Sequence, residues 1–325
     1  MKKILSLLLI VATMLTASVA LTSCGGDDGK YTVGILQLAP HVALDAATEG
    51  FKQALCDELG AENVTFLLQN AQGDPNTCTT IATDFVNKKV DLIMANATGA
   101  LQAAYNATEK IPILGTSVTE YGVALGIDNF TGLVGSNVSG TSDLAPLDQQ
   151  VAVIKELFPE AKKIALVYCS AEPNSLYQVN EVKRLLEADS TIKADLKPFS
   201  DNNDIQTIVS GVASSYDLIY VPTDNAVANA TDIVKNAAGD TPVIAGEEGI
   251  CSGCGVATVC ISYYDLGYTT GKMAAKILKG EANIKEMKIE YAEKFTKKYN
   301  PEIAAEFGFT AAELEALGYT AIVME

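Results

Sequence analysis

Short apolar runs alternate with amphipathic stretches along this chain from residue 31 onward. The apolar runs have the length of buried strands, and the stretches between them repeat apolar residues at the spacing of a helix face. Strands are predicted at 31–38, 64–69, 90–95 and 111–116. Helices are predicted between them, at 43–60, from Asp74-Pro75 onward and at 98–109. Because strands that alternate with helices form parallel sheets, this half of the chain predicts an α/β lobe with helices on both faces of its sheet.

The same alternation starts again at residue 144. The predicted elements are helix 144–158, strand 163–168, helix 175–188, strand 192–199, helix 204–214, strand 216–222, helix 224–238, strand 241–246, strand 255–262 and helix 263–279. The pattern therefore predicts two doubly wound, Rossmann-like lobes with parallel sheets. A ligand cleft is expected between them, since open parallel sheets bind ligands beyond the carboxyl ends of their strands.

The N-terminus has the layout of a secretory signal. Lys2 and Lys3 precede an apolar run over 4–21, and small residues follow it. Leu21-Thr22-Ser23-Cys24 resembles the bacterial lipobox, which implies cleavage before Cys24 and attachment of the Cys24 thiol to lipid. We expect a signal peptide over 1–23 and a lipidated tether over 24–30; the alternative is an uncleaved helical anchor. The expected location is outside the cytoplasm, at the membrane.

Composition and charge narrow the class of partner. Apolar residues make up 48% of the 325-residue chain and charged residues 19%, which is typical of a globular protein. The net charge is −17, and Arg184 is the sole arginine. This balance argues against nucleic acid and anionic lipid headgroups as partners. It also removes the usual bidentate partner of a phosphate or dicarboxylate ligand.

Polar residues follow the predicted strands, where a ligand would bind. The candidate ligand-binding residues are Gln37, His41, Thr98, Gly99, Thr116, Ser117, Glu120, Ser175, Asp224, Asn225 and Glu247. A zwitterionic amino acid needs donors for its carboxylate and an acid for its ammonium. The N-terminal ends of helices, with hydroxyl groups beside them, could bind the ligand carboxylate. Carboxylate side chains could bind the ligand ammonium.

Several of these candidates have an alternative, structural interpretation. Thr98 and Asp224 can each act as the N-cap of the following helix. His41 is the only histidine, which argues against a histidine-based catalytic triad and a polyhistidine metal site. It either contacts the ligand or caps the helix after it.

Cys251 and Cys254 form a CxxC pair between glycines, just before a predicted strand. This position predicts a loop and a disulfide that staples it. The alternatives are a thiol oxidoreductase site and a zinc site that includes Cys260, for which no fourth ligand is evident. No cofactor and no metal are expected.

Several stretches together resemble one protein family. They are ILQLAPHVALDAATEGF, NATGALQAA, TSVTEYGVA, TSDLAPLDQQ, YVPTDNAVA and ISYYDLGYTTGKMAAKIL. They are similar to the substrate-binding lipoproteins of ABC transporters for tryptophan and other aromatic amino acids, over about 32–280. The resemblance implies a periplasmic-binding-protein type I fold, in which the chain crosses three times between the lobes.

On this basis we assign 31–143 plus about 263–285 to the N-terminal lobe, and 144–262 plus about 286–325 to the C-terminal lobe. The expected function is that of a monomeric receptor, not an enzyme. It would bind a small amino-acid-like solute, with an apolar or aromatic L-amino acid favoured, by closing its lobes, and present it to an ABC permease. A nucleoside or a sugar is the alternative ligand, which the lack of tryptophan and the single arginine weaken.

Overall fold

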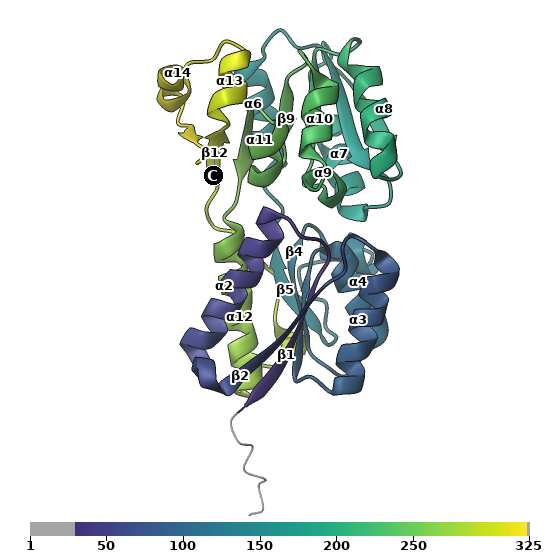
Figure 1. Ribbon diagram of the computed structural model, residues 1–325, viewed down its shortest axis with the longest axis vertical. Coiled ribbons are helices and arrows are strands. Elements are labelled where there is room, and N and C mark those ends of the chain that lie inside the picture. Colours follow the sequence, from purple (N-terminus) through teal and green to yellow (C-terminus); the bar gives the residue numbers. More distant parts are fainter. Residues whose placement is uncertain (1–29, 324–325) are drawn as a thin grey trace, which may run out of the picture.

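Two lobes lie one above the other in the computed structural model, which describes residues 30–323 (Figure 1). Each lobe has a central sheet between layers of helices, so the predicted α/β class with two lobes is confirmed. The predicted signal peptide and Cys24 lie outside the described residues. No helix within residues 30–323 combines the length and the apolar character that a bilayer span needs.

The N-terminal lobe is built on a parallel six-stranded sheet with the order β11-β5-β4-β3-β1-β2. Its strands are β1 (Tyr31–Gln37), β2 (Val64–Asn70), β3 (Leu92–Asn96), β4 (Ile113–Val118), β5 (Val138–Ser142) and β11 (Glu290–Tyr291). Its helices are α2 (Val42–Leu59), α3 (Pro75–Lys88), α4 (Thr98–Ala107), α5 (Tyr121–Leu125) and α12 (Tyr263–Leu278), with the 3-10 turns η1 (Ala61–Asn63) and η2 (Ile284–Glu286). Helices α2 and α12 cover one face of the sheet, and α3 and α4 cover the other (Figure 1).

The C-terminal lobe has a seven-stranded sheet with the order β13-β12-β10-β9-β8-β6-β7, in which β12 runs antiparallel to β10. Its strands are β6 (Lys163–Cys169), β7 (Lys193–Phe199), β8 (Leu218–Val221), β9 (Val243–Ala245), β10 (Ala257–Cys260), β12 (Thr296–Tyr299) and β13 (Thr320–Ala321). Its helices are α6 (Leu147–Leu157), α7 (Pro173–Leu186), α8 (Asn202–Ala213), α9 (Asn225–Ala228), α10 (Thr231–Ala238), α11 (Glu248–Cys254), α13 (Pro301–Glu306) and α14 (Ala311–Ala316). Separate apolar cores lie under α6 and α7 and under α8 and α10.

The chain passes between the lobes after β5, after β10 and after β11. The third crossing comes after Tyr291, later than the boundary at about 286 that the sequence suggested. The reason is that Glu290 and Tyr291 pair with Thr141 and Ser142 and so belong to the N-terminal sheet.

Two predicted segments differ from the structure. The single helix predicted over 224–238 is divided into α9 and α10, because the backbone of Ala230 leaves the helical region (φ −137°, ψ 26°). The loop predicted around the CxxC pair is helix α11, which begins where the Glu247 carboxylate accepts hydrogen bonds from the backbone N–H groups of Gly249 and Ile250.

Strand β5 is buried although its sequence, VSGTS, contains no apolar run. Its polar groups find partners inside the lobe: the Thr141 Oγ1 lies 2.8 Å from Thr270 Oγ1 in α12, and the Ser142 hydroxyl donates to the carbonyl of Thr119. These bonds satisfy the polar side chains that burial would otherwise leave without partners. Hydrophobic patterning cannot detect such a strand.

Helices α2 and α12 meet backbone to backbone. A Cβ added to Gly50 or Gly267 would lie 2.1 Å or 1.9 Å from a backbone oxygen of the other helix. This close contact fixes the N-terminal ends of the two helices relative to each other. Those ends carry His41 and Tyr263, which both reach the space between the lobes.

Candidate ligand-binding site between the lobes

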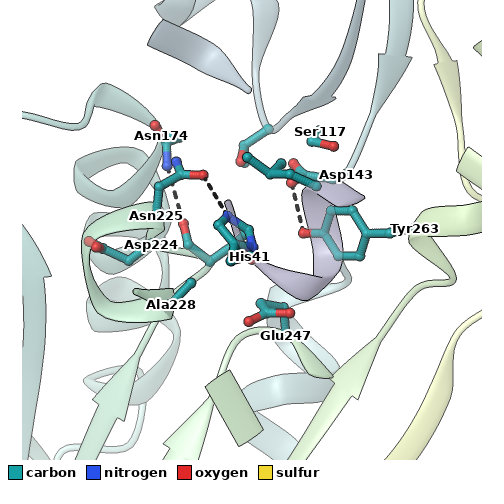
Figure 2. Close-up of a pocket in the computed structure, with 12 residues that line it drawn as sticks. His41, Ser117, Asp143, Asn174, Asp224, Asn225, Ala228, Glu247 and Tyr263 are labelled. Carbon is teal, nitrogen blue, oxygen red and sulfur yellow. Dashed lines mark hydrogen bonds between the residues drawn. The ribbon is translucent and has the colours of Figure 1, made fainter. Parts of the chain in front are cut away.

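Two adjoining spaces lie between the lobes, at the carboxyl ends of the strands. The smaller one, which we call the inner cavity, has a volume of about 10 Å³. Its lining residues are His41, Leu44, Ser117, Thr119, Asp143, Asn174, Thr223, Asp224, Asn225, Ala228, Glu247 and Tyr263 (Figure 2). They come from both lobes and from the first crossing, so the cavity depends on how the lobes meet.

The larger space, which we call the outer groove, has a volume of about 800 Å³ and shares the wall residues Asn174 and Asn225 with the inner cavity. Its N-terminal-lobe wall runs from Leu38 to Pro40, along α3 from Pro75 and along α4 from Gly99. Residues at the start of α7, α8 and α9 form the opposite wall.

A hydrogen bond between His41 and Asn225 joins the lobes beside the inner cavity. The His41 Nε2 lies 3.2 Å from the Asn225 Oδ1 (Figure 2). The Asn225 Nδ2 donates to Glu172 Oε2 at 2.7 Å, so the amide oxygen faces His41 and accepts. The network therefore assigns the proton of the neutral ring to Nε2. Burial lowers the pKa of His41 and favours this neutral form.

Asp143 lies at the first crossing, directly after β5. The Tyr263 hydroxyl donates to the Asp143 Oδ2 at 2.9 Å, which holds the carboxylate in place (Figure 2). Burial raises the pKa of Asp143, and hydrogen bonds with Thr119 and Tyr263 oppose that shift. The carboxylate is thus costly to keep ionised without a positively charged partner.

Three buried oxygens of the inner cavity, Ser117 Oγ, Asp143 Oδ1 and Asn174 Oδ1, have no hydrogen-bond partner among the described residues. A buried polar atom without a partner is costly, and such atoms gather at sites where a ligand completes the set. Ser117 also has a φ of 55°, which is a strained conformation for a residue with a side chain. The cavity is therefore prepared for a polar ligand.

The other two carboxylates of the cavity are already used. Asp224 caps α9 and accepts hydrogen bonds from the backbone N–H groups of Cys169 at 2.7 Å and Val227 at 3.0 Å. In Figure 2 its carboxylate points away from His41. Glu247 caps α11 with both oxygens. Burial, with the nearby carboxylates of Glu248 and Asp143, raises the pKa of Glu247 to about 7.

A second acid stands beside Asp224. Glu172 accepts hydrogen bonds from the backbone N–H groups of Asn225 and Ala226 and from the side chain of Asn174. Its partial burial and the charge of Asp224 raise the pKa of Glu172 to about 7. This pair holds the start of α9, and with it Asn225, in position.

The structure brings five of the predicted site residues together around the inner cavity: His41, Ser117, Asp224, Asn225 and Glu247. Gly99 instead lines the outer groove.

The remaining predicted residues make other contacts. Gln37 bonds to Ala39 O at 2.8 Å and accepts from Thr48, and Thr116 contacts Thr141 inside the lobe. Thr98 is buried as the first residue of α4, Glu120 caps α5, and the Ser175 hydroxyl lies 3.5 Å from Thr223 O. None of these five lines either space.

Thr119, Asn174 and Thr223 also line the inner cavity, and they lie in strand-end segments that the sequence indicates, 116–120, 168–175 and 223–225, although none of the three was named as a ligand contact. Asp143 lies in none of the segments that the sequence indicates. Tyr263, which also lines the inner cavity, is not among the predicted ligand-binding residues. Asp143 and Thr119 directly follow or flank strand ends, so the strand-end rule would have found Asp143 had β5 been recognised.

The structure does not contain the disulfide that the sequence predicts between Cys251 and Cys254. Cys251 and Cys254 lie in helix α11 as free thiols, and each thiol donates to a backbone carbonyl, Cys251 to Gly255 O just after the helix and Cys254 to Ile250 O. The expected disulfide between them is therefore absent from this structure. Burial raises the pKa of both thiols, whereas thiol–disulfide exchange requires an accessible thiolate. Within residues 30–323 no cluster of three or more histidine, cysteine or acidic side chains could hold a metal ion.

Comparisons with known proteins give consistent matches over most of the chain. A family model described as ABC transporter substrate binding protein matches residues 32–319. A tyrosine-binding protein of Clostridioides difficile is 38% identical over 299 residues, which cover 86% of this chain and 85% of that protein.

Solved structures are similar over the same range. An ABC domain of Streptococcus pneumoniae in complex with L-Trp superposes with a TM-score of 0.83 at 30% identity, covering 90% of this chain and 100% of that one. The ligand-free, open structure of a substrate-binding protein with adhesive properties from Clostridium difficile gives a TM-score of 0.70 at 36% identity, covering 91% and 100%.

Proposed function

This chain belongs to the ABC transporter substrate-binding protein family, and on that premise we propose that it binds an L-amino acid with an apolar or aromatic side chain between its lobes. Its relative in Clostridioides difficile is a tyrosine-binding protein, and its relative from Streptococcus pneumoniae was solved in complex with L-Trp. The partner in the membrane is the permease of an ABC importer. The protein works outside the cytoplasm and delivers its ligand without changing it.

The observation that carries this proposal is the set of unpartnered oxygens around the inner cavity. The Asn174 Oδ1 is an acceptor only, and so is the Asp143 Oδ1 when Asp143 is ionised. The two oxygens therefore suit a donor such as an ammonium group. Ionised Asp143 supplies the opposite charge. An ammonium bound there would also relieve the cost of burying the Asp143 carboxylate.

The carboxylate of the ligand needs donors instead. The Ser117 hydroxyl faces the cavity, and the N-terminal ends of α4, α7 and α8 surround the adjoining groove. Helix N-termini carry a partial positive charge and N–H groups without intrahelical partners. These groups replace the arginine that many carboxylate sites use.

The arrangement of the lobes supports capture by closure. Although the open, ligand-free relative is more similar in sequence, the chain superposes better on the relative in complex with L-Trp. The His41–Asn225 bond joins the lobes in this arrangement. A ligand that touches both lobes favours the closed state, which a permease can then distinguish from the open one.

We also propose that residues 1–23 are a signal peptide and that lipid on Cys24 anchors the protein to the membrane. The support is the lipobox-like LTSC sequence after an apolar run. The glycines and aspartates at 25–29 suit a flexible tether between the anchor and β1.

Mass spectrometry of small molecules released when the purified protein is denatured tests the ligand directly. Isothermal titration calorimetry of the ligand-free protein against phenylalanine, tyrosine, tryptophan, leucine and a set of nucleosides and sugars then ranks them. Binding of a nucleoside or sugar without any response to amino acids would overturn the proposed ligand.

A further inference from the structure

The inner cavity and the outer groove differ greatly in size, at about 10 Å³ and about 800 Å³. A cavity of the smaller size holds about one water molecule. In this closed arrangement it therefore accommodates a group such as an ammonium but not a whole amino acid. The rest of the ligand must lie in the outer groove, whose volume is within the range of pockets for much larger ligands.

The outer groove is also long. Gly99, Gln102, Ala103 and Asn106 all line it, and their spacing places them along one face of α4. From Gly99 to Asn106 the helix rises about 10 Å at 1.5 Å per residue. An extended chain advances about 3.3–3.6 Å per residue, so this wall matches about three residues of an extended peptide.

The chemistry of the walls suits peptide groups. Side-chain amides line the groove at Gln72, Gln102, Asn106 and Asn229, and an amide offers both a donor and an acceptor, as a peptide group does. Leu38 also lines the groove and supplies apolar surface. Asn174 lies at the junction with the inner cavity, where its buried Oδ1 has no hydrogen-bond partner among the described residues.

The charges favour a ligand whose carboxylate is far from its ammonium. Asp143, Asp224 and Glu247 line the inner cavity, and Glu172 and Asp201 line the outer groove, where Asp201 caps α8; no lysine or arginine lines either space. In a free amino acid the carboxylate stays close to these acids. Each residue added to its carboxyl end moves the carboxylate about 3.3–3.6 Å further away along the groove.

We propose that the outer groove makes this a site for short peptides with a free amino terminus, in which the terminal ammonium binds at Asp143 and two further residues lie along α4. The inference rests on the proposed function, because it uses the same ammonium site. It extends the class of ligand from single amino acids to di- and tripeptides.

Calorimetry with the purified, ligand-free protein tests the inference. The probes are L-tyrosine, the tripeptide tyrosyl-alanyl-alanine and the same tripeptide with an acetylated amino terminus. We expect the free tripeptide to bind within about tenfold of tyrosine, a difference of about 1.4 kcal/mol. Acetylation should weaken binding about 30-fold or more, since it removes the charge that pairs with Asp143.

An Asn106→Trp variant tests the outer groove separately from the ammonium site, because Asn106 is exposed and lies at the end of the α4 wall. The bulky ring should weaken binding of the tripeptide about tenfold more than it weakens binding of tyrosine. Asp143→Asn should weaken both ligands. Circular dichroism of each variant checks that it is folded.

The outcomes separate the two proposals. Binding of tyrosine without binding of the free tripeptide overturns the peptide inference and leaves the amino-acid function intact. Binding of the tripeptide alone supports the inference and corrects the proposed ligand. No response to the tripeptide or to any amino acid in the panel overturns both. Equal loss of tyrosine and tripeptide in Asn106→Trp also contradicts the two-part site.

Discussion

The imidazole of His41 and the side-chain amide of Asn225 lie 3.2 Å apart across the cleft, with His41 in the N-terminal lobe and Asn225 in the C-terminal lobe. His41 stands at the start of α2 and Asn225 at the start of α9. Glu172 orients the Asn225 amide, so the contact is directional. The bond can form only when the lobes are close together, and it therefore stabilises the closed state directly.

Removal of this bond should favour the open state. We expect His41→Ala to shift the closed-to-open equilibrium by about 1 kcal/mol, the usual net value of a hydrogen bond, and to weaken ligand binding about fivefold. Small-angle scattering should show a larger radius of gyration for the ligand-free variant. A double-mutant cycle with Asn225→Ala isolates the pair, and a coupling energy of zero would refute the role of the bond.

The close contact of α2 and α12 predicts a stability effect. Gly267→Ala places a Cβ 1.9 Å from the backbone oxygen of Ala47, so the helices must move apart, at a cost of about 1–3 kcal/mol of unfolding free energy. Chemical denaturation measures it. Gly211→Ala in α8 is the matched control, because no atom outside its own stretch of helix backbone and its chain neighbours lies within 4 Å of the added Cβ. That change should raise stability by about 0.5–1 kcal/mol.

Glu247 predicts a pH dependence of stability in the ligand-free protein. Its pKa is about 7 in the folded state and about 4.3 in an unfolded chain. Between these values the folded state binds more protons than the unfolded state, so stability is highest below about pH 4.3 on account of this group and falls as the pH rises through 7.

Glu247→Gln should therefore reduce the loss of unfolding free energy between pH 5 and pH 8, by on the order of 1–3 kcal/mol. Denaturation series at several pH values, for wild type and variant, give the two slopes. The glutamine keeps one oxygen that can cap α11. The loss of the second capping bond lowers the unfolding free energy at every pH, so it affects the dependence on pH less than the absolute stability of the variant. Identical slopes would show that Glu247 does not titrate in this range.

Hydrophobic patterning was sufficient to predict most strands and helices and the two-lobed architecture. It did not predict β5, whose Thr141 and Ser142 side chains are buried because their partners come from α12 and the β4–α5 turn. Those partners are distant in sequence, so no local pattern reports them. Asp143, which directly follows β5, was therefore missing from the predicted site.

The carboxylates of the cavity also show what local sequence cannot predict. The sequence correctly placed Asp224 and Glu247 at strand ends, and both line the inner cavity. Whether a carboxylate oxygen is available to a ligand depends on its other partners. One oxygen of Asp224 accepts a hydrogen bond from the backbone N–H group of Cys169, 55 residues away in the sequence, and only the folded structure shows this.

The lipobox predicts attachment to the membrane. Cys24→Ala should abolish incorporation of labelled palmitate and move the protein from the detergent phase to the aqueous phase in Triton X-114 partitioning. Cys56→Ala, which changes a half-buried cysteine of α2, should leave both properties unchanged. Unaltered partitioning of Cys24→Ala would rule out lipid attachment at this residue.

The ammonium site leads to the sharpest prediction. Asp143 Oδ1 has no hydrogen-bond partner among the described residues, whereas both oxygens of Asp224 accept backbone hydrogen bonds. Asp143→Asn should therefore weaken amino-acid binding by about 2–5 kcal/mol, about 30-fold or more, because it leaves the ligand ammonium without its charged partner. Calorimetry measures the affinity, and denaturation measures the stability of the same variants.

Asp224→Asn should lower the stability of the protein more than its affinity for the ligand. It weakens the cap of α9, so we expect a loss of about 1 kcal/mol in unfolding free energy with a smaller change in affinity than Asp143→Asn causes. The two substitutions remove the same charge from the same cavity, so their difference measures which carboxylate meets the ligand. A larger loss of affinity in Asp224→Asn than in Asp143→Asn would move the ammonium site to the start of α9.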